Sequence, residues 1–237
     1  MGDADRTPAA PANKAEVEAF ADAMRKAPDK AGQPQPGRGR LVFALDATMR
    51  RQPTWDLAQQ VQGQMFAAAA SCGGLDIQLV YFRGFNECCA SAFMRDGAGL
   101  ARAMSKISVM GGQTQIGRVL RHIRAERAEA PLAAFVYIGD CMEEKADELG
   151  RIAGELGLLG VKGFFFHEGG GAREAACFKD LARLTGGAYA VFDSGAPGRL
   201  ANLLRAAAAY AAGGFSALSD RARKGDTDAR QLLSQMR

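Results

Sequence analysis

Oxygen-bearing side chains stand at the ends of apolar runs in this sequence. Asp46 and Thr48 come directly after the first apolar run, Thr114 stands in a loop that contains two glycines, and Asp140 ends a later apolar run. Carboxylate and hydroxyl oxygens are the ligands that hard divalent cations prefer, and Mg²⁺ usually keeps several waters beside one or two carboxylates. The residue types therefore predict a site for Mg²⁺, Mn²⁺ or Ca²⁺, if the fold brings these segments together.

The elements that would position these residues form a regular alternation of short apolar runs and amphipathic segments. Such an alternation is typical of a doubly wound α/β fold, with a mostly parallel sheet of about six strands covered by helices on both faces. Only a four-residue turn separates the second run from the third, so these two strands must be antiparallel. Thr54 is the expected N-cap of the first helix of the alternation. The expected strands are 41–45, 75–82, 87–94, 133–138, 161–166 and 188–192.

Ligands of doubly wound sheets bind beyond the carboxyl ends of the parallel strands. Asp46, Thr48 and Asp140 follow such strand ends in the predicted fold, and Thr114 comes after the Gly111-Gly112 loop. We therefore expect two carboxylates and two hydroxyls to meet at one rim of the sheet. Asp and Thr are also ordinary turn and capping residues, so strand-end capping is the alternative interpretation of the same four positions.

The chain from about residue 40 to 212 resembles a von Willebrand factor type A (VWA) domain of the intracellular bacterial type. The metal-ion-dependent adhesion site (MIDAS) of that family uses D-x-S-x-S after the first strand, a Thr in a later loop and an Asp closing a later strand. The matching positions here are Asp46, Thr48, Thr114 and Asp140, in the runs LVFALDATMRRQPTWD, MGGQTQIGRVL and FVYIGDCMEE. The resemblance implies a Rossmann-like sheet in which the antiparallel strand 87–94 is a short edge strand.

Arg50 occupies the position of the second Ser in D-x-S-x-S, so the site is incomplete relative to the family. A guanidinium group has no acceptor atom and cannot coordinate a cation. If Arg50 points at the site, its charge opposes the metal and holds Asp46 or Asp140 instead. If Arg50 points away, water fills the vacant position. A site modulated by Arg50 and a degenerate site, in which the fold is a scaffold without metal, therefore both stay open.

The resemblance also implies a function, which is binding rather than catalysis. In the family the metal keeps one coordination position open, and an Asp or Glu of a partner protein fills it. Hydroxyl ligands are neutral, so the cation keeps positive charge for that incoming carboxylate. Intracellular bacterial relatives often work beside an ATPase or another assembly factor. The expected partner is thus a protein that presents Asp or Glu, in the assembly of a complex.

A phosphate hydrolase of the haloacid dehalogenase type is the alternative from another class. Such enzymes also have an Asp after the first strand and a Gly-Asp after a later one. Their chemistry normally needs a second Asp two residues after the nucleophile, as an acid/base, whereas position 48 here is Thr. Nucleotide binding has less support, because the chain has no G-x-x-x-x-G-K-[ST] and no G-x-G-x-x-G after the first strand.

Composition excludes several other classes. A chain of 237 residues with 48% hydrophobic and 24% charged residues can bury a sizeable core and is not a disordered polymer. Most of the +4 net charge lies in residues 1–40 and 213–237, so the central part gives no argument for a nucleic-acid partner. No apolar stretch has the roughly 20 residues of a membrane span. The acidic, proline-rich N-terminus is unlike a secretory signal. With five scattered cysteines and no CxxC, we expect reduced thiols and a cytoplasmic location.

The sequence divides into three parts. Residues 1–40 form an N-terminal tail, with a short amphipathic helix at about 13–27 and a Pro/Gly-rich linker after it. Residues 41–212 form the VWA-like domain. Residues 213–237, which follow Ala212 and begin with Gly213-Gly214, carry two short helical patterns and form a C-terminal helical appendage.

Overall fold

The computed structural model of the chain describes residues 37–48, 52–193 and 197–236. The expected N-terminal helix, most of the linker and Arg50 lie outside the described residues.

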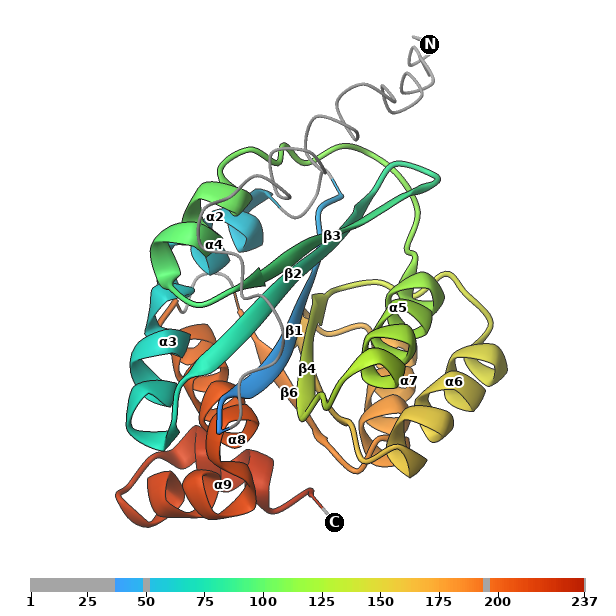
Figure 1. The fold of residues 1–237 in the computed structure, drawn as a ribbon. Helices are drawn as coiled ribbons and strands as arrows, with labels where there is room; N and C mark the ends of the chain where they lie inside the picture. The colour runs from blue at the N-terminus through green and yellow to red at the C-terminus, as the bar shows by residue number, and fades with distance from the viewer. Residues whose placement is uncertain (1–36, 49–51, 194–196, 237) are drawn as a thin grey trace, which may run out of the picture.

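A six-stranded sheet crosses the described part of the chain, in the order β3-β2-β1-β4-β5-β6 (Figure 1). Every neighbouring pair is parallel except β2 and β3, which are antiparallel, so β3 is an edge strand. This confirms the expected Rossmann-like sheet and its one antiparallel edge strand. The strands are β1 (Gly39–Asp46), β2 (Leu75–Arg83), β3 (Glu87–Met94), β4 (Ala134–Gly139), β5 (Lys162–Glu168) and β6 (Ala188–Phe192).

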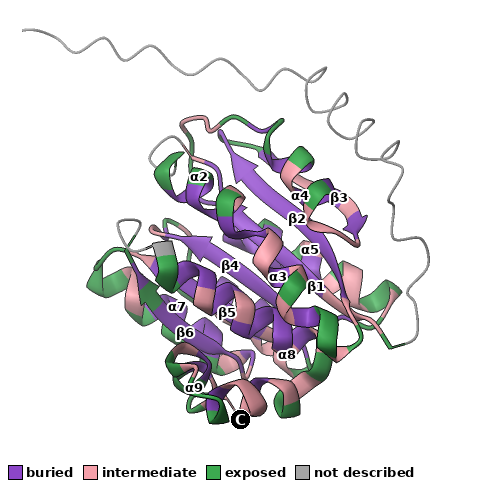
Figure 2. Cartoon of the chain, turned by 90° about the vertical axis from the view of Figure 1, so that its left-hand side faces the viewer, coloured by how far each residue is buried: buried purple, intermediate pink, exposed green. Residues whose placement is uncertain are grey.

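Helices cover both faces of the sheet. On one face lie α2 (Gln52–Val61), α3 (Gly63–Ala69), α4 (Gly97–Met104), α8 (Pro197–Arg223) and α9 (Thr227–Leu233), with a 3₁₀ turn at Ala70–Cys72. On the other face lie α5 (Ile116–Glu129), α6 (Ala146–Leu158) and α7 (Ala172–Leu184). Strands β1, β2 and β4 are almost entirely buried between the two layers, whereas the edge strand β3 is about half buried (Figure 2). Among the described residues, no helix has the length and apolar character needed to cross a membrane.

Burial on both faces explains why β1 reads as an unbroken apolar run. Successive side chains of a strand point to opposite faces. Leu41, Phe43 and Leu45 therefore pack under α8 and its neighbours, and Val42 and Ala44 pack under α5 to α7. Asp46 is the first polar side chain of this run, and the alternation places it on the same face as Ala44, where the strand ends.

The C-terminal helices pack on the same core as the sheet. Helix α8 is kinked at Gly214, whose φ of 67° lies in the left-handed region that favours glycine. Beyond this kink, Leu218 of α8 and Leu232 of α9 are completely buried. Gln235 then exchanges hydrogen bonds with the main chain of Tyr189 on β6, at 3.0 and 2.9 Å. Residues 213–236 therefore contact the sheet layer directly.

Candidate metal centre

A pocket of about 410 Å³ opens where the carboxyl ends of β1 and β4 meet the loop before α5. The four residues singled out from the sequence all line this pocket, although they come from three separate segments. The structure thus brings the two carboxylates and two hydroxyls to one rim. The lining residues are Asp46, Thr48, Gly111, Gly112, Thr114, Asp140, Cys141 and Glu143.

The loop after β1 is fixed by hydrogen bonds on three sides. Asp46 is only 4% exposed, and its Oδ1 accepts the amide N–H of Thr48 at 2.8 Å. The amide of Ala47 donates to the carbonyl of Phe82, and its carbonyl accepts the amide of Met110. These bonds place Thr48 beside the Asp46 carboxylate and hold both against the loop that carries Thr114.

The turn between β2 and β3 supports the loop that carries Thr114. The amide of Gln113 donates to the carbonyl of Gly84 at 3.0 Å. The side-chain amide of Gln115 donates to the carbonyl of Arg83 at 3.1 Å. Gly112 lies so close that a Cβ at this position would overlap the Gly84 carbonyl. Glycine at 112 is therefore required by a close approach of two main chains.

Glu143 is a pocket residue that was not predicted from the sequence. Its carboxylate accepts the amide of Thr114 at 2.9 Å, and its own amide donates to the Thr114 hydroxyl at 3.1 Å. A hydroxyl has two lone pairs, so Thr114 Oγ1 keeps acceptor capacity for a cation after this bond. The sequence signal for this contact is the pair of adjacent acidic residues, Glu143 and Glu144, which follows Gly139-Asp140 after two intervening residues.

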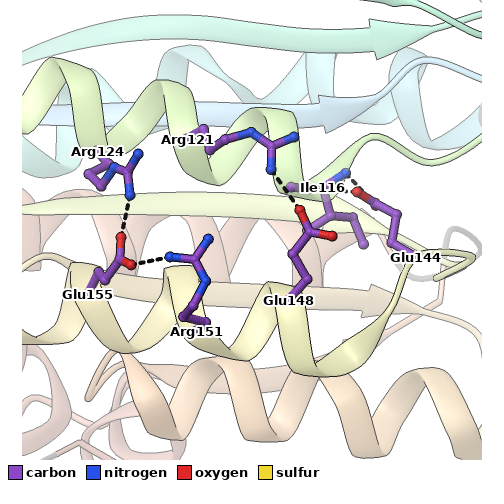
Figure 3. Close-up of polar contacts among 8 residues, drawn as sticks. Ile116, Arg121, Arg124, Glu144, Glu148, Arg151 and Glu155 are labelled. Atoms are coloured by element: carbon purple, nitrogen blue, oxygen red, sulfur yellow. Dashed lines mark hydrogen bonds and ion pairs between the residues drawn. The ribbon is translucent and has the colours of Figure 1, made fainter.

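Glu144 caps the helix that follows Thr114. Its carboxylate accepts hydrogen bonds from the amides of Ile116 and Gly117, at 2.6 and 2.8 Å (Figure 3). The N-cap residue of α5, Gln115, makes no capping hydrogen bond with its own side chain. Burial raises the pKa of the Glu144 carboxyl group, and these two hydrogen bonds oppose part of that rise. The loop after β4 therefore fixes the start of α5, and with it the position of Thr114.

Two basic side chains of α5, Arg121 and Arg124, pair with acidic residues of α6. Arg121 pairs with Glu148 at 3.1 Å, and Arg124 and Arg151 both pair with Glu155 (Figure 3). These groups are partly exposed, so each pair adds little to stability. The Arg121–Glu148 and Arg124–Glu155 pairs join the two helices, whereas the Arg151–Glu155 pair lies within α6.

Tyr137 lies beneath the pocket in the layer between the sheet and α5 to α7. The residue is completely buried, and its hydroxyl has no hydrogen-bond partner among the described residues. Burial raises its pKa well above the ordinary tyrosine value, and the charges of Asp46, Glu144 and Asp140 raise it further. Leaving a buried donor unpaired costs about 1–3 kcal/mol, so this hydroxyl is a costly feature of the fold.

Cys141 lines the pocket, and the ring of His167 lies beside the main chain of Asp140. The His167 ring is fully buried, with Nδ1 2.9 Å from the Tyr189 hydroxyl and Nε2 3.3 Å from the Asp140 carbonyl. Burial and the charge of Glu143 raise the pKa of the Cys141 thiol, which disfavours the reactive thiolate. The five cysteines are free thiols.

The candidate ligands of the pocket combine charged carboxylates with neutral hydroxyls. Within residues 37–48, 52–193 and 197–236, no group of three or more His, Cys, Asp and Glu side chains is placed to hold a metal ion. A cation in this pocket would therefore depend on the Thr48 and Thr114 hydroxyls and on water, beside Asp46 and Asp140. Such a mixed oxygen set suits a hard cation that keeps part of its hydration shell.

Comparison with known proteins gives no match to a family model and no match among curated proteins. Solved structures do match. The VWA domain of SpRpn10 aligns with a TM-score of 0.54 and 12% identity, over 66% of this chain and 89% of that one. A von Willebrand factor type A protein from Catenulispora acidiphila aligns with a TM-score of 0.61 and 15% identity, over 74% of this chain and 43% of that one.

A third structure, proximal thread matrix protein 1 from the mussel byssus, is described with a zinc-occupied MIDAS motif. It aligns with a TM-score of 0.55 and 16% identity, over 73% of this chain and 46% of that one. The present chain thus spans less than half of this protein and of the Catenulispora protein. The fold and the rim pocket define an α/β domain of the Rossmann-like class. Within that class, the chain has the VWA fold that the sequence resemblance implied.

Proposed function

We propose that this chain is a non-catalytic protein-binding domain that engages an acidic residue of its partner through a divalent cation. Asp46, Thr48, Thr114 and Asp140 would hold the cation, with Mg²⁺ or Mn²⁺ as the first candidates. The observation that carries the proposal is the pocket at the sheet rim, which all four residues line.

Three features support a cation in this pocket. The four side chains offer only oxygen donors, and two of these donors are neutral hydroxyls. Beneath the same pocket, the hydroxyl of Tyr137 is buried without a partner among the described residues. A buried donor in this state is expected if an acceptor oxygen comes within its reach only when the cation is bound. A protein of the same fold is described with zinc in its MIDAS motif.

The mode of binding follows from charge. Thr48, Thr114 and water are neutral ligands, so they do not offset the charge of the cation, and a coordination position left open can attract a further anion. A carboxylate from a partner would complete the coordination shell, while the protein groups orient the cation and exclude some of the water. The partner would be a protein such as an ATPase or an assembly factor that presents Asp or Glu.

A scaffold without metal is the second candidate, and one observation favours it. Arg50 stands where the VWA motif has a Ser ligand, and a guanidinium cannot replace that ligand. In this interpretation the same rim contacts a partner without any cation.

Calorimetric titration of Mg²⁺ and Mn²⁺ into the wild type, Asp46→Ala and Arg50→Ser distinguishes the two candidates. The metal-bridged function predicts a binding signal in the wild type that Asp46→Ala abolishes and that Arg50→Ser strengthens or leaves intact. No binding by the wild type, with binding restored in Arg50→Ser, would identify a degenerate metal site and favour the scaffold. A phosphatase activity that vanadate inhibits and that Asp46→Asn abolishes would instead support the alternative interpretation, a hydrolase of the haloacid dehalogenase type.

A further inference from the structure

The buried hydroxyl of Tyr137 has a role that the packing of its ring does not explain. The ring stacks on Phe82 with centroids 6.3 Å apart, and it also contacts Phe165 and Phe178 at 5.9 and 5.6 Å. A phenylalanine would make all of these contacts. The hydroxyl is nevertheless present, is completely buried and has no partner among the described residues. Buried polar groups are rarely left in this state, and each exception calls for a reason.

The register of the sheet directs this hydroxyl toward the end of β1. Tyr137 lies opposite Ala44, and the neighbouring pair is Leu45 with Ile138. Asp46 is two residues beyond Ala44 and therefore lies on the same face of the sheet. The hydroxyl also reaches the main chain of Gly139, where an added Cβ would lie 2.7 Å from the phenolic oxygen. It thus lies below the two strand ends that supply Asp46 and Asp140.

The electrostatic surroundings favour a role as a donor. Besides burial, the charge of Asp46 is the largest cause that raises the pKa of Tyr137, followed by the charges of Glu144 and Asp140. A tyrosine phenol is protonated at neutral pH even at its ordinary pKa of about 10, and the raised pKa acts in the same direction. The hydroxyl is therefore a buried O–H donor within the electrostatic influence of the Asp46 and Asp140 carboxylates.

We infer that Tyr137 is a positioning residue of the cation site, whose hydroxyl donates to the Asp46 carboxylate when a bound cation draws that group into its coordinating position. This inference rests on the proposed metal-dependent function. Asp46 Oδ1 already accepts the amide of Thr48 at 2.8 Å, so the phenol supplies a further restraint on the same carboxylate. Ligating carboxylates are commonly held by such outer hydrogen bonds, whose loss costs about 10–100-fold in metal affinity.

The test compares Tyr137→Phe with the wild type by Mn²⁺ calorimetry and by thermal unfolding in the presence of a chelator. In chelator, the melting temperature of Tyr137→Phe should equal or exceed that of the wild type, because the substitution removes a hydroxyl that has no partner there. Its Mn²⁺ affinity should fall by about tenfold or more. The combination of an unharmed metal-free protein and a weakened site is the expected signature.

Tyr81→Phe is the matched control. Tyr81 is also buried in a strand, but its hydroxyl donates to Glu87 Oε1 at 2.9 Å, away from the pocket residues. Tyr81→Phe should lower the melting temperature in chelator and leave Mn²⁺ affinity unchanged. A similar loss of metal-free stability in Tyr137→Phe would show that its hydroxyl is already paired, and would overturn the inference.

The remaining outcomes separate this inference from the function on which it depends. Equal Mn²⁺ affinity for the wild type and Tyr137→Phe would overturn the positioning role and leave the metal site standing. A wild type that binds no Mn²⁺ would overturn the proposed metal-dependent function itself.

Discussion

Thr114 and Glu143 exchange two hydrogen bonds, one from each main-chain amide to the side chain of the other residue. This reciprocal pair joins the loop before α5 to the loop after β4, and both loops line the pocket. The position of the Thr114 hydroxyl is thereby fixed before any ligand arrives. The rim is held by contacts between loops, and its properties can be tested one contact at a time.

Thr114→Val should weaken the cation site more than it weakens the fold. Valine has nearly the same shape as threonine but has no oxygen for a cation or for the Glu143 amide. We expect a loss of stability of about 1 kcal/mol, the usual net value of one hydrogen bond, and a fall in Mn²⁺ affinity of about tenfold or more. Urea unfolding and calorimetry measure the two effects. Thr114→Ser keeps the hydroxyl and should retain Mn²⁺ binding; equal affinities for the Val and Ser variants would exclude Thr114 as a ligand.

Gly112→Ala should displace the loop that carries Thr114. An added Cβ would overlap the Gly84 carbonyl, which belongs to a main chain held in a tight turn. Overpacking of this kind costs about 1–3 kcal/mol, and the resulting shift should also reduce Mn²⁺ affinity. Gly111→Ala is the control, because nothing lies within 4 Å of a Cβ at that position. If both variants unfolded at the same urea concentration, the close approach at Gly112 would have no energetic role.

His122 should make the fold less stable as the pH falls below neutral. Burial lowers the pKa of its imidazole from the ordinary value of 6.5, although the charge of Glu126 opposes part of that shift. The unfolded chain therefore takes up this proton at a higher pH than the folded chain does. The contribution to stability is present above pH 6.5 and is lost as the pH falls through the lower pKa of the folded state.

Urea unfolding of the wild type and His122→Gln between about pH 7.5 and 5 measures this contribution. The stability difference between the two proteins should change in favour of His122→Gln as the pH falls. His167, the other histidine of the chain, is present in both proteins and cancels in the comparison. A difference that stayed constant with pH would contradict the lowered pKa.

The partner's carboxylate can be tested with synthetic peptides before any partner is known. Short peptides that contain one Glu should compete with one another for the Mn²⁺-loaded protein, and their Gln counterparts should bind at least about tenfold more weakly, because only a carboxylate can complete the coordination shell with charge. Fluorescence anisotropy measures the affinity, with Asp46→Ala as the control protein. Binding that survives excess chelator and Asp46→Ala would support a scaffold rather than a metal bridge.

Much of the fold could be predicted because its signals are local. Strands that are buried on both faces are uninterrupted apolar runs, and the polar residues that end them mark the rim of the sheet. Asp46 and Asp140 could therefore be placed together from the sequence, with Thr114 added by its glycine-containing loop. The identification of these residues as cation ligands remains a prediction, because lining the same pocket shows only that the residues lie close together.

The contacts that the sequence did not reveal are those between distant segments. Thr54 was the expected cap of its helix, but α2 begins at Gln52 and the Thr54 hydroxyl donates to Glu168. The start of α5 is capped by Glu144, which lies beyond the following strand. The unpaired hydroxyl of Tyr137 depends on which described side chains surround it in three dimensions. Periodicity and capping rules contain no information on such long-range partners.

The turn between β2 and β3 limits how the pocket could be grafted onto another protein. Its two main-chain carbonyls, at Arg83 and Gly84, are the supports of Gln115 and Gln113, on either side of Thr114. The three pocket loops alone would lose these supports in another host. A functional graft would have to include the β2–β3 hairpin, which supports the loop of Thr114. The smallest segment set that could be transferred is therefore larger than the set of residues that line the pocket.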